Sequence, residues 1–189
     1  MAEVIGAVPL GMAGLIFPLF AWFYAIFAKY ELKPEEMKGI AVAELIGFIS
    51  LLIQSVWHTI ANPFGAVISM LFTTIPAMYA FIWLLAFFTH WFGLDPKPLG
   101  DCALCITISE CIATACFFVL GIGLPWQVII DLVIYAPFTT IGFYLANHGY
   151  GGKAVIYYVG VMCFLAWLAT IDLQFWGAGI LPAYTPPIV

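Results

Sequence analysis

Long apolar runs, separated by short polar connections, dominate the chain from residue 8 to residue 175. A helix needs about 20 apolar residues to cross the hydrocarbon core of a bilayer, and its backbone polar groups must be satisfied within the segment. We therefore predict six transmembrane helices, at roughly residues 8–28, 39–59, 66–91, 100–122, 125–147 and 153–175. No connection is long enough to fold separately, so residues 1–189 are expected to form one all-α, six-helix membrane domain.

The composition supports this interpretation. Apolar residues make up 65% of the chain and charged residues only 8%, which excludes an ordinary soluble domain. The first seven residues carry one charge and no basic region, so we expect no removable signal peptide.

All basic residues apart from the histidines are lysines, and they lie on one side of the predicted helices. Lys29, Lys33 and Lys38 flank the first connection, Lys97 the third and Lys153 the fifth. Lysine-bearing connections are biased toward the cytoplasm. We therefore predict a multi-pass protein of the cell membrane (plasma or inner membrane), with these connections cytoplasmic and both termini outside.

Prolines suggest an internal repeat. Pro18, Pro76 and Pro137 each interrupt an odd-numbered predicted helix, at intervals of 58 and 61 residues, and the even-numbered helices each contain a carboxylate. This pattern predicts three helical hairpins packed around a common axis. The alternative is that prolines are simply frequent in membrane helices.

Carboxylates within the predicted spans are the sharpest chemical signal. A charge at mid-bilayer costs at least about 2.5–3.5 kcal/mol, so such groups face a cavity, pair with another group or stay protonated. No lysine or arginine within a span is available as a partner. We expect Glu110 and Asp131, the deepest, to be protonatable groups of a pore or an interface, whereas Glu44, Asp172 and His90 are expected to reach the membrane interface.

The histidines argue against a metal centre. His58 is predicted at the outer end of the second helix, nearly a bilayer thickness from His90 and His148 at the inner end. No nucleophile–base pair or metal-binding set can be assembled at one depth. We therefore predict no catalytic site, no metal or other cofactor and no nucleic-acid partner.

The predicted interior holds acidic side chains and no lysine or arginine, which restricts the kinds of solute that can enter it. A carboxylate anion would be favoured there only by helix N-termini and backbone amides, whereas small neutral solutes, or weak acids in their protonated form, meet no such penalty. Abundant aromatic side chains make any pore narrow and apolar, which excludes hydrated ions.

Three segments resemble a known transporter family. Val8–Met12, which opens the first helix, is similar to the Asn-Pro-Ala-Pro-Leu-Gly signature of the acetate and succinate transporters of the YaaH/SatP type. Asn62–Ala66 resembles that family's Asn-Thr-Phe-Gly-Ala motif, and Val159–Ala169 is similar to its last helix. The connection Phe92–Pro98 resembles the Phe-Gly-Leu-Asp-x-Arg-Pro loop of the related UreI/AmiS urea and amide channels. Both resemblances imply a six-helix protomer with its own pore and a homohexameric ring.

The transporter resemblance also implies site residues. It places the apolar constriction at Leu15 and Phe72, where the family has phenylalanine and tyrosine. It assigns the two entrances of the path to Pro9, Leu10, Gly11, Asn62, Phe64 and Gly65. Loss of the tyrosine hydroxyl weakens the case for acetate. Pro9 is also a normal helix start, and Asn62 with Pro63 is a normal turn.

We therefore predict a membrane channel or transporter, not an enzyme, for a small monocarboxylate such as acetate, crossing as the neutral acid or with a proton. The alternative within transport is a urea or short-amide channel. A third hypothesis does not involve transport: the chain is then a structural subunit of a larger membrane complex, with no pore of its own.

Overall fold

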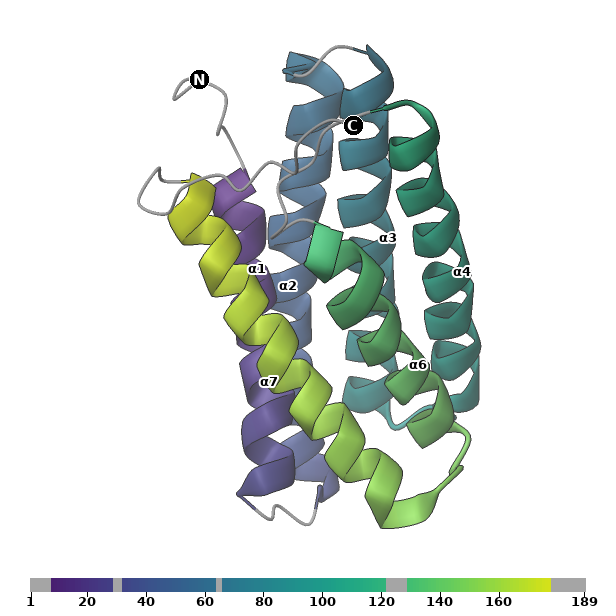
Figure 1. Ribbon diagram of the computed structural model, residues 1–189. Coiled ribbons are helices and arrows are strands. Elements are labelled where there is room, and N and C mark those ends of the chain that lie inside the picture. The colour runs from purple at the N-terminus through teal and green to yellow at the C-terminus, as the bar shows by residue number, and fades with distance from the viewer. Residues whose placement is uncertain (1–7, 29–31, 64–65, 122–128, 178–189) are drawn as a thin grey trace.

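The computed structural model describes residues 8–28, 32–63, 66–121 and 129–177, and every regular element in these ranges is helical. The elements are α1 (Val8–Phe27), α2 (Pro34–Ala61), α3 (Ala66–Phe92), α4 (Lys97–Val119), η2 (Asp131–Tyr135), α6 (Ala136–Asn147) and α7 (Gly152–Gly177) (Figure 1). The predicted all-α fold is confirmed.

Five of these helices, α1, α2, α3, α4 and α7, are long and apolar enough to cross a membrane. Their boundaries lie within a few residues of the predicted ones, except that α2 begins at Pro34 instead of residue 39. Pro34 has the fixed backbone angle of a first helical residue, and the Lys33 backbone N–H donates to the Glu36 carboxylate at 3.0 Å. Because of these two features, α2 begins at Pro34, before its apolar run.

The fifth predicted span, residues 125–147, is not one unbroken α-helix. Residues 122–128 lie outside the described ranges, and η2 is a π-helical turn in which the Ala136 N–H donates to the Asp131 carbonyl, five residues back. Pro137 follows directly and lacks the N–H that would continue an α-helical ladder. The described structure therefore supports five spans of full length and a shorter, broken helical segment.

The helices form a closed ring in sequence order. Each of α1, α2, α3, α4, α6 and α7 packs against its neighbour in the chain, and α7 packs against α1. The helix termini that carry lysines all lie at the same end of this ring, which we call the lysine-bearing end (Figure 1). Lys38 at the start of α2 lies 5.8 Å from the ring centroid of Trp91 at the end of α3. At the same end, His148 Nε2 lies 3.3 Å from Asp101 Oδ1 of α4.

Glycines allow α1 and α2 to approach closely. A Cβ atom at Gly14 would overlap the Ser50 side chain, and one at Gly11 would overlap Gln54. Small residues at such crossings let two membrane helices pack backbone to backbone. Gly11, which the resemblance places at an entrance, is therefore buried against α2 and serves helix packing.

Replacing Gly14 by alanine should lower the thermal unfolding midpoint in detergent, because overpacking a tight contact costs about 1–3 kcal/mol. Gly39 of α2 is the matched control, since nothing lies within 4 Å of a Cβ atom placed there. Gly39→Ala should leave the midpoint unchanged or raise it, because alanine favours a helix. Equal midpoints for the two variants would show that the α1–α2 contact tolerates a methyl group.

Candidate functional site

The ring of helices encloses a cavity of about 100 Å³, to which every described helical element contributes side chains. Such a volume holds several water molecules or one very small solute. Most of the lining is apolar and includes Leu15, Leu19, Leu51, Ile75, Ile82 and Leu132. The fold thus provides an internal, mainly apolar chamber.

Three carboxyl groups line this cavity, from Glu44, Glu110 and Asp131, and no lysine does so within the described part of the chain. Glu44 and Glu110 are fully buried. The Tyr79 hydroxyl donates to Glu110 Oε2 at 2.9 Å, and threonine hydroxyls of α6 and α7 complete the polar lining. The cavity therefore holds hydrogen-bonding groups but no fixed positive charge.

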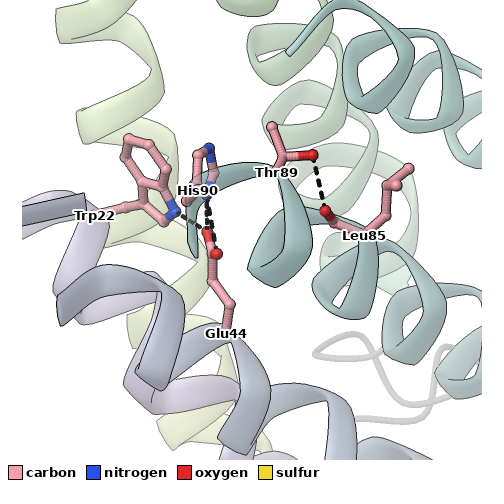
Figure 2. Close-up of polar contacts among 5 residues, drawn as sticks. All are labelled: Trp22, Glu44, Leu85, Thr89 and His90. Carbon is pink, nitrogen blue, oxygen red and sulfur yellow. Dashed lines mark hydrogen bonds and ion pairs between the residues drawn. The ribbon is translucent and has the colours of Figure 1, made fainter. Parts of the chain in front are cut away.

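Glu44 lies at the lysine-bearing end of the cavity and is held from two other helices (Figure 2). Trp22 Nε1 donates to Glu44 Oε1 at 3.0 Å, and His90 Nδ1 lies 2.9 Å from both carboxyl oxygens. The side chain of Glu44 is 0% exposed and that of His90 is 9% exposed. These contacts join α1, α2 and α3 through one carboxyl group.

The carboxylates were expected to have no basic partner within the spans, and for Glu44 this prediction is wrong, since His90 lies beside it and is cationic whenever it is protonated. A signal was present in α2: its buried residues recur every three or four positions and include the polar residues Glu44, Ser50, Gln54, Ser55 and His58. That spacing marks a polar face turned toward the ring interior.

A second hollow, which we call the vestibule, has a volume of about 590 Å³ at the lysine-bearing end. Trp22, Lys38, Trp91 and Ile156 contribute to its wall. His90 and Phe143 line both the vestibule and the cavity. The two hollows therefore meet at these two side chains.

Three rings separate the vestibule from the cavity. The Trp22 ring centroid lies 5.3 Å from that of His90 and 5.7 Å from that of Phe143, each in an edge-to-face arrangement. We call Trp22, Glu44, His90 and Phe143 the neck. Because Glu44 binds two of the three rings, it fixes the position of this barrier.

The structure separates the two residues of the predicted constriction. Leu15 lines the cavity, as does the predicted protonatable pair of Glu110 and Asp131. Phe72 instead packs with its ring centroid 6.0 Å from His58 and 5.7 Å from Phe117, and it is not among the described residues of the cavity wall. Phe72 therefore belongs to the α2–α3–α4 packing beside the cavity.

The predicted entrance residues have local roles where they are described. Leu10 is exposed, and Asn62 ends α2 in a left-handed conformation, with its backbone N–H donating to the His58 carbonyl at 3.1 Å. Pro9 lies in the first turn of α1. Phe64 and Gly65 lie outside the described residues.

Among the described residues, no group of three or more histidine, cysteine, aspartate or glutamate side chains is close enough to hold a metal ion. The three carboxyl groups of the cavity wall come from α2, α4 and η2, and they are suited to hydrogen bonding. No family model, curated protein or solved structure matches this chain. The resemblance to the acetate and urea transport families therefore depends on the quoted motifs alone.

Proposed function

We propose that this chain is a membrane channel or transporter for a small monocarboxylate such as acetate, which crosses as the neutral acid or together with a proton. The observation that carries the proposal is a cavity inside a closed helical ring, whose described lining holds three carboxyl groups and neither lysine nor arginine. An acetate anion in that cavity would lie near Glu44, Glu110 and Asp131, and like charges at close range in a low dielectric repel strongly. The neutral acid avoids this repulsion.

The proposed path runs from the vestibule through the neck into the cavity. The path requires the neck to open, because Trp22, His90 and Phe143 close it in this structure. We also propose that the segment 125–147 makes a sixth crossing, which completes three hairpins around the path. The lysine-bearing end is then cytoplasmic, by the positive-inside bias, and the family resemblance supports a homohexamer with one path in each protomer.

Uptake into proteoliposomes tests the proposal. Acetate flux above that of protein-free vesicles should rise as pH falls, because the neutral fraction of the solute increases. Methanesulfonate, which has a similar shape and stays ionised, is the matched solute and should not cross. Comparable flux of methanesulfonate and acetate would overturn the proposal.

A urea or short-amide channel is the second candidate, and the acidic lining favours it too. Carboxylate oxygens accept hydrogen bonds, and an amide offers N–H donors at every pH. Acetamide or urea flux that is independent of pH, with acetate at background, would select this candidate. Background flux of all these solutes, with constant co-purification of other membrane subunits, would instead favour a structural subunit.

A further inference from the structure

Two residues that line the cavity each have a buried polar atom without a hydrogen-bond partner among the described residues. The atoms are Trp83 Nε1 and Glu110 Oε1, and their residues are 5% and 0% exposed. No other described residue of this cavity has such an atom. A buried polar group without a partner is costly, so its position in a wall that encloses free space points to a ligand.

The chemistry and the neighbours of these two atoms determine whether each can donate or accept a hydrogen bond. The Tyr79 hydroxyl donates to Glu110 Oε2, which orients the carboxyl group and leaves Oε1 as an acceptor when the group is ionised and as an O–H donor when it is protonated. The indole nitrogen of Trp83 has no lone pair to accept with and only donates. Tyr79 and Trp83 are four residues apart in α3, so both lie on the same face of that helix. Trp83, which carries a donor, and Glu110, which carries an acceptor when it is ionised, therefore both line the same cavity.

The indole of Trp83 is also held in place. Its ring centroid lies 6.1 Å from that of Phe143, with the two planes at 89°, the edge-to-face arrangement that aromatic rings prefer. Phe143 belongs to the neck, so the donor lies close to the point where a solute would leave the vestibule. A fixed donor loses little entropy when it binds.

We propose that Trp83 Nε1 and Glu110 Oε1 are the two polar anchors of a solute site in this cavity. The indole N–H donates to a carbonyl oxygen, and Glu110 Oε1 accepts from the O–H or N–H on the same carbon. The ligand class is therefore a short carboxylic acid in its neutral form or a short primary carboxamide. This assignment depends on the proposed transport function. An ionised carboxylate does not fit while Glu110 is ionised, because it has no donor for Glu110 Oε1.

Concentration-dependent uptake of acetamide and of acetic acid into proteoliposomes tests the assignment. Trp83→Phe keeps an aromatic ring but removes the donor, and Glu110→Gln places an amide nitrogen where an acceptor is needed. Each should raise KM for the transported solute roughly three- to tenfold, the range expected for one hydrogen bond, with a smaller change in maximal rate. Trp167→Phe is the control, because Trp167 packs against Phe20 and Phe164 away from the cavity, and its KM should stay unchanged.

Uptake of acetamide and of acetic acid shows which of the two ligand classes the protein transports. Saturable acetamide uptake at neutral pH identifies a carboxamide, whereas saturable acetic acid uptake that follows the neutral fraction identifies an acid. If the wild-type protein carries neither, the proposed function fails before the variants are considered. If the wild-type protein carries one of them and both variants keep its KM, the function stands and the two anchors are wrong.

Competition between labelled and unlabelled solutes for uptake by the wild-type protein tests the same assignment without any substitution. Acetone has the shape and carbonyl of acetamide but no donor for Glu110. It should therefore inhibit labelled acetamide or acetic acid uptake at least about threefold more weakly than unlabelled acetamide does. Equal inhibition by the two compounds would overturn the role of Glu110.

Discussion

Replacing Ala103 by phenylalanine should reduce solute flux to the level of protein-free vesicles. Ala103 is fully buried in α4, and its methyl group is part of the cavity wall. An apolar cavity of about 150 Å³ holds a benzene molecule, so a phenyl ring would fill the smaller cavity of this protein. The proposed path would then be blocked inside the cavity.

Ala115→Phe is the matched control, because Ala115 lies on the same helix with its side chain exposed. This variant should keep wild-type flux. Ala103→Val adds less volume and should give an intermediate flux, which separates blockage from misfolding. Wild-type flux in a well-folded Ala103→Phe protein would show that the solute does not pass through this cavity.

Removing the Glu44 side chain should produce the largest loss of stability. Glu44→Ala leaves Trp22 Nε1 and His90 Nδ1 without the acceptor that both contact, inside a neck with almost no solvent access. Breaking a buried pair by removing one partner costs about 3–5 kcal/mol when both groups are charged, and about 1–3 kcal/mol for an unsatisfied neutral group. The thermal midpoint in detergent should fall accordingly. Glu35→Ala, at an exposed position in the first turn of the same helix, should have little effect.

A double-mutant cycle with His90→Phe measures the contact itself. If Glu44 and His90 stabilise the fold through each other, the double variant should lose less stability than the sum of the single variants. The difference should be at least about 1 kcal/mol, as is usual for residues in direct contact. Additive losses would show that the 2.9 Å approach contributes nothing of its own.

The same variants report on transport. Because Glu44 holds two of the three rings that close the neck, its removal should loosen the barrier as well as the fold. Maximal uptake by Glu44→Ala, corrected for the amount of folded protein, should therefore be at least that of the wild type.

The helices were predictable from the sequence because the apolar runs are long and their connections are short. Backbone groups in hydrocarbon have no alternative to the helical ladder, so hydropathy alone places most boundaries. Pro137 indicated an interruption of this helix, but the π turn at Asp131–Tyr135 was not predictable, because Leu132, Val133 and Ile134 are as apolar as an unbroken helix would be. Only the backbone pattern distinguishes the π turn.

The candidate site was predictable in part. Glu110 and Asp131 were identified because a carboxylate within a span is rare and costly. The neck was missed because Trp22, Glu44 and His90 lie on three helices, and hydropathy describes each helix separately. The environment of Glu44 was predicted from its position along one helix, whereas it is determined by side chains of two other helices. Motif similarity placed Leu15 on the cavity wall, but it also selected Phe72, whose ring packs beside the cavity.

The π turn also determines which side chains of this segment face the cavity. One extra residue in a turn rotates everything before it by about 100° around the helix axis. Asp131 and Ala136 both line the cavity at a spacing of five residues, as this extra residue requires, whereas Ala136, Thr140 and Phe143 follow ordinary helical spacing. Deleting a single residue between positions 132 and 135 would turn the π turn into an α-helical turn and leave Asp131 four residues from Ala136, so its carboxyl group would still face the cavity. Winding the unchanged sequence as an α-helix would instead rotate Asp131 away from the cavity, so the wider turn keeps this carboxyl group on the cavity wall.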